Sequence, residues 1–214
     1  MKKISLIVYD FDGTLVDTLA DIANSVNLAL AEMNLNTLNR EVIRGNIGNG
    51  VVNLMTRSLV ESGCNDVETA VSLFRKHYNN HLLDQTDFYP NGREVVQHFS
   101  GKKNAILSNK PFALIEKILK ALNFLQHFDS ILGGDSLGVQ KPDPKGLQLL
   151  MSKLNCPAKQ VLMIGDSAID IETGKQAGVL TCGVTYGLGD PDSLRDAKPD
   201  YLIDNLSHLK LLFN

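Results

Sequence analysis

Two carboxylates, Asp10 and Asp12, stand where the first apolar run of the chain ends. That run, residues 4–8, is short and rich in β-branched side chains, which predicts a buried strand that turns at Gly13. If the backbone stays extended, residues two apart point to the same side. Their like charges then repel unless a cation lies between them or one carboxylate takes a proton. The pair therefore indicates a metal site or an acid/base pair, with an ordinary polar turn as the alternative.

Further polar side chains follow three later predicted strands, at residues 104–107, 130–132 and 161–164. Taken singly, they have simpler interpretations: Ser108 and Asn109 as a helix cap or turn, Lys141 as a solvated surface lysine, and Asp170 as an acid in the first turn of a helix. Because open parallel sheets bind ligands at the carboxyl ends of their strands, we expect these side chains to meet the first pair there. They are Ser108, Asn109, Lys141, Asp166 and Asp170.

Such a set of groups suits phosphoryl transfer, which depends mainly on positioning and on neutralising charge around the phosphoryl oxygens. Carboxylate oxygens are the ligands that Mg²⁺ prefers, and Asp10, Asp12 and Asp166 supply them. Lys141 would pair with phosphate as a point charge, and Ser108 would donate a hydrogen bond to it. A carboxylate nucleophile would form an acyl phosphate.

The elements that position these residues fall into two kinds. Apolar spacings of three and four predict four helices and no strand between residues 17 and 86: Asp17–Met33, Arg40–Asn46, Val51–Val60 and Asp66–Leu83. Strands and helices alternate afterwards, with further strands at 181–184 and 201–203 and helices at 93–99, 112–122, 144–154, 169–177 and 206–211. This pattern predicts an α/β fold, a doubly wound parallel sheet of residues 1–15 and 87–214, with an inserted all-helical domain of residues 16–86.

Composition is that of an ordinary globular protein. Of 214 residues, 43% are hydrophobic and 21% charged, and the net charge is -3 without a block of like charge. Nothing in this pattern favours binding to nucleic acid or to an anionic membrane. Three scattered cysteines predict reduced thiols, and the first apolar run is too short for a signal peptide. We therefore expect a cytoplasmic protein with no nucleic-acid or membrane partner.

Four stretches resemble the four motifs of the haloacid-dehalogenase (HAD) superfamily of phosphotransferases. They are Asp10–Thr18, Ser108, Lys141 and Asp166–Asp170, in that order and across most of the predicted α/β domain. The resemblance implies that Asp10 is the nucleophile and Asp12 the general acid/base. It places Mg²⁺ on the first Asp, the backbone carbonyl of the second, and Asp166, with Asp170 as a further ligand or beside one. The phosphoryl pocket would include Ser108, Asn109, Lys141 and the backbone N–H groups from Phe11 to Gly13.

The helical insertion resembles the small cap of this superfamily, which closes over the substrate and excludes water. Asn46–Val51 looks like the cap loop of bacterial phosphoglycolate phosphatases, and Ser108–Pro111 and Pro199–Ile203 are similar to other segments of theirs. Gly48 and Asn49 in that loop, with Arg44 beside it, are therefore candidate substrate contacts. A Gly/Asn-rich turn and an exposed arginine are the alternatives.

The resemblance implies a Mg²⁺-dependent phosphatase that hydrolyses a small phosphomonoester through an aspartyl-phosphate, with phosphoglycolate as the first substrate to test. A sugar-phosphate mutase like β-phosphoglucomutase and a pyrophosphatase are alternatives within the superfamily. A phospho-accepting switch is the non-enzyme alternative, although Asp12 supplies a base for dephosphorylation and a receiver domain has no cap. The expected partner is a small phosphorylated metabolite, bound by a monomer or a homodimer.

Overall fold

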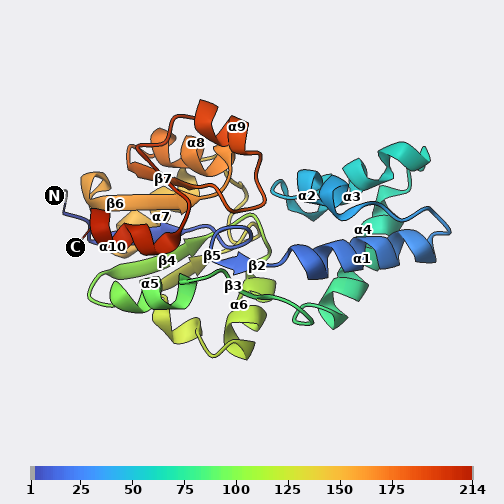
Figure 1. The fold of residues 1–214 in the computed structure, drawn as a ribbon, viewed down its shortest axis with the longest axis horizontal. Coiled ribbons are helices and arrows are strands. Elements are labelled where there is room, and N and C mark those ends of the chain that lie inside the picture. Colours follow the sequence, from blue (N-terminus) through green and yellow to red (C-terminus); the bar gives the residue numbers. More distant parts are fainter. Residues whose placement is uncertain (1–2, 214) are drawn as a thin grey trace.

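The computed structural model describes residues 3–213, and within them a six-stranded parallel sheet forms the centre of the larger part of the molecule (Figure 1). The strand order is β5-β4-β1-β6-β7-β8. The bounds are β1 Leu6–Tyr9, β4 Lys103–Leu107, β5 Ser130–Leu132, β6 Val161–Gly165, β7 Leu180–Val184 and β8 Tyr201–Ile203. The chain leaves β1 toward β4 and later returns to its other side at β6. The topological switch point, where such sheets bind ligands, therefore lies between β1 and β6.

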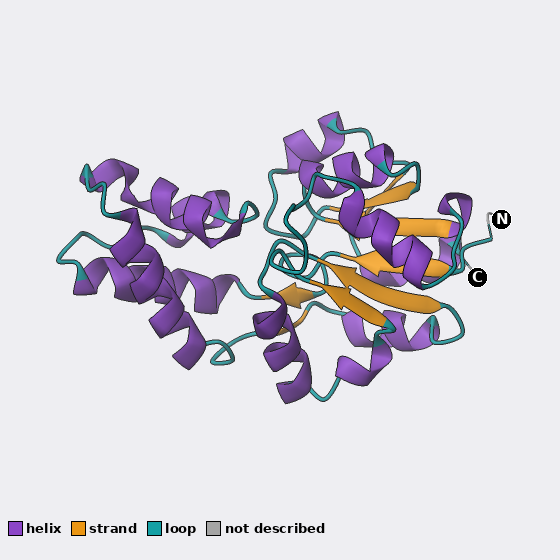
Figure 2. Cartoon of the chain, turned by 180° about the vertical axis from the view of Figure 1, so that it is seen from behind, coloured by secondary structure: helices purple, strands orange, loops and turns teal. Residues whose placement is uncertain are grey.

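Helices cover both faces of this sheet, as the alternating sequence predicts (Figure 2). Leu6 and Val8 pack in one apolar cluster with α7 (Lys145–Lys153), on the face that α8 (Ala168–Gln176) also covers. Ile7 and Tyr9 point to the opposite face and pack in the cluster that includes residues of α5, α6 and α10. Those helices are Gly92–His98, Phe112–Ala121 and Leu209–Leu212. The period-2 alternation of a buried strand thus explains why β1 joins two cores.

Four helices form a separate unit, here called the helical unit: α1 Leu19–Glu32, α2 Arg40–Asn46, α3 Gly50–Leu59 and α4 Val67–Asn80. It lies to one side of the sheet, opposite both termini (Figure 1). All four are helices at the predicted positions, with ends shifted by up to three residues. The apolar stripe of α1, including Ile22 and Val26, is buried in the same cluster as Phe74 of α4. Amphipathic spacing therefore located these helices correctly.

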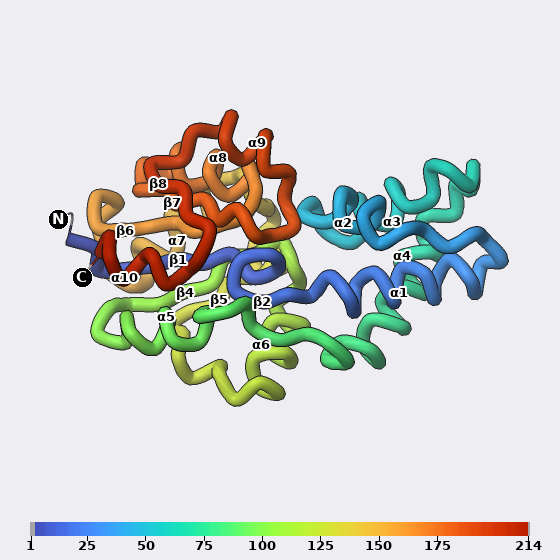
Figure 3. Tube along the Cα trace, in the orientation of Figure 1, coloured from blue at the N-terminus to red at the C-terminus, as the bar shows by residue number. Residues whose placement is uncertain are grey.

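The chain enters and leaves the helical unit along two neighbouring segments (Figure 3), and each segment forms a short strand. β2 (Val16–Asp17) pairs antiparallel with β3 (Asp87–Phe88). Nearby, the buried Asp21 carboxylate accepts hydrogen bonds from the backbone N–H and the hydroxyl of Thr86, at 2.9 and 2.7 Å. The sequence did not predict either strand, because each is two residues long and their pairing joins distant parts of the chain.

Smaller elements complete the chain. Helix α9 (Pro191–Asp196), which the sequence analysis missed, places Leu194 against Gly183 of β7. The predicted terminal helix consists of a 3₁₀ turn, Leu206–His208, followed by α10. The remaining 3₁₀ turns are Val60–Ser62, Leu125–His127 and Ala158–Gln160. Among residues 3–213, none of the helices combines the length and the hydropathy needed to cross a membrane.

Candidate active site

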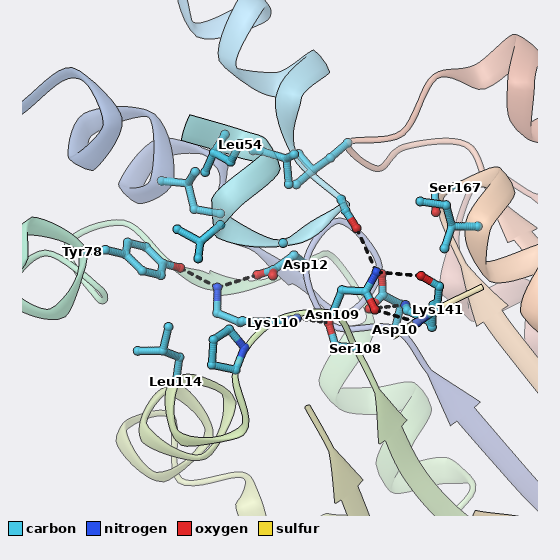
Figure 4. A pocket seen from close by; sticks show the side chains of 18 of the residues that line it. Asp10, Asp12, Leu54, Tyr78, Ser108, Asn109, Lys110, Leu114, Lys141 and Ser167 are labelled. Carbon is cyan, nitrogen blue, oxygen red and sulfur yellow. Dashed lines mark hydrogen bonds and ion pairs between the residues drawn. The ribbon is translucent and has the colours of Figure 1, made fainter. Parts of the chain in front are cut away.

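The site residues predicted on the α/β domain come together at the carboxyl edge of the sheet, facing the helical unit; Figure 4 shows Asp10, Asp12, Ser108, Asn109 and Lys141 among them. Asp10 follows β1, Ser108 follows β4, and Asp166 follows β6, so each side chain begins where a central strand ends. Lys141 arrives on the longer loop after β5. Together with Asp12 and Asn109 they line one cavity of about 330 Å³ between the sheet edge and the helical unit.

Lys141 forms ion pairs with two of the acids. Its ammonium lies 2.8 Å from an oxygen of Asp10 and 2.6 Å from an oxygen of Asp170. The Lys141 side chain is only 3% exposed, so these ion pairs are formed away from water. Burial by itself would lower the pKa of Lys141, but the two carboxylates outweigh it and the pKa is raised, which keeps this lysine charged.

Asp166 is fixed by hydrogen bonds to both oxygens. One oxygen accepts from the Thr14 hydroxyl at 2.9 Å, and the other accepts from the backbone N–H groups of Leu188 and Gly189 at 2.7 and 2.9 Å. The loop after β7 can approach this closely because Gly187 has no Cβ; a Cβ at this position would collide with the Asp166 side chain. The loop after β7 therefore orients an acid that belongs to β6.

Asp170 is completely buried in the first turn of α8. Its second oxygen accepts from the backbone N–H of Ser167 at 3.2 Å and from the Ser167 hydroxyl at 2.7 Å. The first of these bonds and the reciprocal bond from the Asp170 backbone N–H to the Ser167 side chain form a capping box. Asp170 is thus an acid in the first turn of a helix, as the simpler interpretation predicts. The same carboxylate also reaches Lys141 and the site.

Three of these acids form a compact group, here called the acid cluster: Asp10, Asp166 and Asp170. Each offers one carboxylate oxygen, and those oxygens all lie within 4.8 Å of one another. Burial raises the pKa of Asp10 to about 7; Lys141 opposes this rise, whereas Asp170 and Asp166 add to it. Burial and the charge of Asp170 raise the pKa of Asp166 to about 6. The cluster therefore carries more negative charge than Lys141 compensates.

This donor set fits a divalent metal ion. Hard carboxylate oxygens are the ligands of Mg²⁺, and the three carboxylates face the ammonium of Lys141, which pairs with Asp10 and Asp170. With all three acids ionised and Lys141 protonated, one divalent cation would neutralise the group. Asp12 is not part of this carboxylate group, so only its backbone carbonyl remains as the ligand that the sequence analysis assigned to it.

Asp12 has a separate set of partners. One of its oxygens, Oδ1, accepts from the Thr18 hydroxyl at 2.7 Å and from the ammonium of Lys110 at 2.9 Å. That ammonium also donates to the hydroxyl of Tyr78 at 2.7 Å (Figure 4). Lys110, Tyr78 and Thr14 have no role in the site predicted from the sequence. Lys110 stands two residues after Ser108, a signal that was available, whereas Tyr78 lies in the apolar stripe of α4 and looked like core.

Asn109 acts as a link between loops. Its side-chain oxygen accepts from the Lys141 backbone N–H at 2.9 Å, and its amide nitrogen donates to the carbonyls of Lys141 and Gly48 at 3.2 Å each. Ser108 is buried at the cavity, and its hydroxyl accepts from the Lys110 N–H at 3.4 Å. Asn109 thus fixes the backbone that carries Lys141 and contacts the helical unit.

The backbone after Asp10 is arranged differently from the expectation. The Phe11 N–H donates to the Asp10 carboxylate at 2.7 Å, and the Gly13 N–H donates to the carbonyl of Val16 at 3.0 Å. The phenyl ring of Phe11 is buried in the core. Binding of a phosphoryl group by either N–H stays a prediction that requires these bonds to break. Gly13 has a positive φ of 82° and packs against Asp166 where a Cβ would collide.

The helical unit supplies most of the apolar wall of the cavity, through Ile22, Ile47, Val51, Leu54 and Phe74. Gly48 lines the cavity, whereas Asn49, the N-cap residue of α3, does not. Arg44 is not among the lining residues, because its guanidinium donates to the carbonyls of Gly187 at 2.8 Å and Leu188 at 3.3 Å. Arg75 of α4, which the sequence analysis did not single out, does line the cavity.

Comparison with known proteins identifies the family. Residues 7–184 match the model of the haloacid dehalogenase-like hydrolases. The chain belongs to this family. A phosphoglycolate phosphatase of Haemophilus influenzae is 36% identical over 97% of this chain and 97% of its own length, and one of Colwellia psychrerythraea is 33% identical over 98% and 96%. A crystal structure described as a predicted phosphoglycolate phosphatase from Haemophilus somnus is 31% identical, covers 99% of both chains and gives a TM-score of 0.94.

This haloacid dehalogenase-like protein is therefore a phosphatase, a phosphoric monoester hydrolase, as the motifs predicted. The expected α/β fold with a parallel sheet is also confirmed. Phosphatases of the family generally use a divalent metal, and the acid cluster could hold one.

Proposed function

We propose that this protein is a Mg²⁺-dependent phosphatase that hydrolyses a small phosphomonoester through a phosphorylated Asp10. The observation that carries the proposal is the shared cavity: Asp10, Asp12, Lys141 and Asp166 all line it, and Asp10 and Asp166 belong to the acid cluster. A nucleophile, an acid/base, a cation and a set of hard oxygen ligands are the parts that phosphoryl transfer requires.

In the first step, a carboxylate oxygen of Asp10 attacks the phosphorus atom, and the bond from phosphorus to the leaving oxygen breaks. Asp12 gives its proton to that oxygen, so the alcohol leaves neutral and Asp12 becomes a carboxylate. In the second step, Asp12 takes a proton from a water molecule, whose oxygen attacks the phosphorus. The bond to Asp10 breaks, inorganic phosphate is released, and both residues return to their starting states.

The other residues handle the charge of the phosphoryl group. Lys141 lies 2.8 Å from Asp10 and would place its ammonium beside the phosphoryl oxygens during transfer. Ser108 and Asn109 line the same cavity and offer a hydroxyl and an amide to those oxygens. Asp10, Asp166 and Asp170, with the Asp12 carbonyl, would hold Mg²⁺, which would supply positive charge to balance the phosphoryl oxygens.

The helical unit, bounded by the connections at residues 16 and 86, is proposed to act as a cap that closes over the substrate. Three observations support this role. The short β2–β3 pair joins it to the sheet, it forms the apolar wall of the cavity, and it contacts the core through Gly48, Arg44 and Tyr78. An apolar wall displaces water, which protects the acyl phosphate until a positioned water molecule reaches it.

Phosphoglycolate is the leading substrate, because the relatives that align over nearly the whole chain are named phosphoglycolate phosphatases. The test is phosphate release by the purified protein with Mg²⁺ across a panel of phosphoglycolate, sugar phosphates, nucleotides and pyrophosphate. We expect many turnovers and a preference for phosphoglycolate. Stoichiometric labelling of Asp10 without release would contradict the phosphatase mechanism, and a preference for another compound would contradict only the substrate.

A further inference from the structure

The carboxylate of Asp12 is held by both ends of the helical unit. Thr18, directly before α1, donates its hydroxyl to Oδ1 of Asp12 at 2.7 Å. Lys110 donates to the same oxygen at 2.9 Å and also to the hydroxyl of Tyr78, near the end of α4, at 2.7 Å. The structure therefore contains a continuous chain of hydrogen bonds from α4 to the proposed acid/base.

This chain of contacts is buried and charged. The Lys110 side chain is 4% exposed, and its ammonium also lies 4.6 Å from the centre of the Tyr78 ring. The Tyr78 ring is stacked on Phe74, so its position follows that of α4. A buried ammonium with a carboxylate, a hydroxyl and an aromatic face around it has little freedom to move.

The geometry on Asp12 has a consequence for proton transfer. Two donors converge on Oδ1, whereas in residues 3–213 the other oxygen, Oδ2, accepts no hydrogen bond. Asp12 lines the cavity next to Asp10. A carboxylate anchored through one oxygen presents its other oxygen in one direction, which is what proton transfer to a leaving oxygen requires.

We infer that Lys110 and Tyr78 are positioning residues that align Asp12 for proton transfer only when the helical unit is seated on the core. The inference rests on the proposed function, because it assumes that Asp12 is the acid/base. Lys110 would not contact the phosphoryl group, which has Lys141 instead. With the helical unit displaced, Lys110 would lose Tyr78, and Asp12 would lose part of its support. Alignment of the acid would thus be coupled to closure over a substrate.

The experiment uses single-turnover release of the leaving group from three substrates with Mg²⁺. Phosphoglycolate and ethyl phosphate release alkoxides, which need a proton, and differ in whether they carry a carboxylate. p-Nitrophenyl phosphate releases a stabilised phenolate that leaves without one. For Lys110→Met we expect release from both alkyl substrates to slow by on the order of 10²-fold, and release from p-nitrophenyl phosphate to change little.

Tyr78→Phe removes one hydroxyl from a stacked ring and provides a variant that keeps the fold. We expect the same pattern with a smaller loss, about tenfold or less for the alkyl substrates. Lys103→Met and Tyr201→Phe are the matched controls; Lys103 pairs with Asp129 at the start of β4, Tyr201 packs on Phe213, and neither lines the cavity. Both controls are expected to keep the parental rates.

Three outcomes would overturn the inference. An equal loss for all three substrates would show a merely structural role, and a loss confined to phosphoglycolate would show that Lys110 binds the substrate carboxylate; both leave the phosphatase proposal standing. An Asp12→Asn variant that releases ethanol from ethyl phosphate at the parental rate would remove the acid/base itself. That result would count against the proposed mechanism as well.

Discussion

The sheet edge and the helical unit contribute to one cavity in opposite ways. The sheet edge supplies buried charge: an acid cluster within 4.8 Å, held by Lys141, by the loop after β7 and by a helix cap. The helical unit supplies mostly apolar side chains, such as Leu54 and Phe74, and reaches the core through a few polar contacts. The acids have fixed partners on neighbouring loops, whereas the wall is joined to the sheet by two short connections.

This difference separates chemistry from selection. Charged groups act on phosphorus only at defined distances, so they are built on strand ends that cannot shift without disrupting the sheet. A substrate must also enter and leave, which requires a wall that can move. We therefore expect substitutions of the acids at the sheet edge to abolish turnover, and substitutions in the helical unit, apart from Tyr78, to change substrate preference. The following predictions test that division.

The largest effect is expected for Asp10→Asn. The substitution keeps the shape of the side chain but removes the proposed nucleophile, so turnover should fall by about 10⁴-fold or more. The measurement is phosphate release with Mg²⁺, with far-UV circular dichroism and a thermal melt to show that the fold survives. Comparable activity in this variant would remove Asp10 from the role of nucleophile.

Metal removal is expected to have the next largest effect. Excess chelator should reduce phosphate release to background, and added Mg²⁺ should restore it. Asp166→Asn takes one charge from the acid cluster, so the Mg²⁺ concentration for half-maximal activity should rise by about tenfold or more. Full activity in chelator would contradict the metal requirement, and an unchanged Mg²⁺ dependence in the variant would remove Asp166 from the metal site.

Stability without metal should depend on pH in a characteristic direction. The folded-state pKa values of Asp10 and Asp166 are raised to about 7 and about 6, from 3.8. Between about pH 4 and pH 7 the folded protein therefore holds protons that the unfolded chain has released. Their contribution to the free energy of unfolding is present below pH 4 and is lost as the pH rises through these folded-state values.

Urea unfolding in chelator, from pH 4 to pH 8, measures this contribution. Asp10→Asn is the reference, because it lacks one of the two carboxyls, so the parental protein should lose more stability than the variant over this range. Mg²⁺ should stabilise the parental protein more at pH 8 than at pH 5, since protons compete for the same oxygens. A parental protein that gains stability relative to Asp10→Asn as the pH rises would refute the assignment.

The smallest effects are expected for two arginines of the helical unit, which form a matched pair. Arg75 lines the cavity, whereas the guanidinium of Arg44 is bound to the carbonyls of Gly187 and Leu188. Arg75→Met should raise KM for phosphoglycolate by about tenfold relative to ethyl phosphate, as expected for one lost ionic hydrogen bond. Arg44→Met should change KM for both substrates about equally. A selective effect of Arg44→Met would restore the role that the sequence analysis gave to that residue.

The sequence determined the parts of this protein that depend on local pattern. Apolar periodicity located the helices of the helical unit and the six strands of the sheet, because period and burial follow directly from backbone geometry. The sheet rule then placed Asp10, Ser108, Lys141 and Asp166 at one edge, and the structure brings them together there. The family followed from the same residues, since they recur at characteristic places along the chain.

Only the tertiary structure decided which polar groups meet across the chain. Tyr78 belongs to an ordinary apolar stripe until α4 lies beside the loop after β4 and the Tyr78 hydroxyl meets Lys110. Arg44 and Arg75 cannot be distinguished by residue type. In the folded protein Arg44 donates to backbone carbonyls of the loop after β7, whereas Arg75 lines the cavity. Such contacts join residues tens to more than a hundred positions apart. The geometry of these contacts is set by how the helical unit packs against the loops of the sheet, which no local pattern encodes.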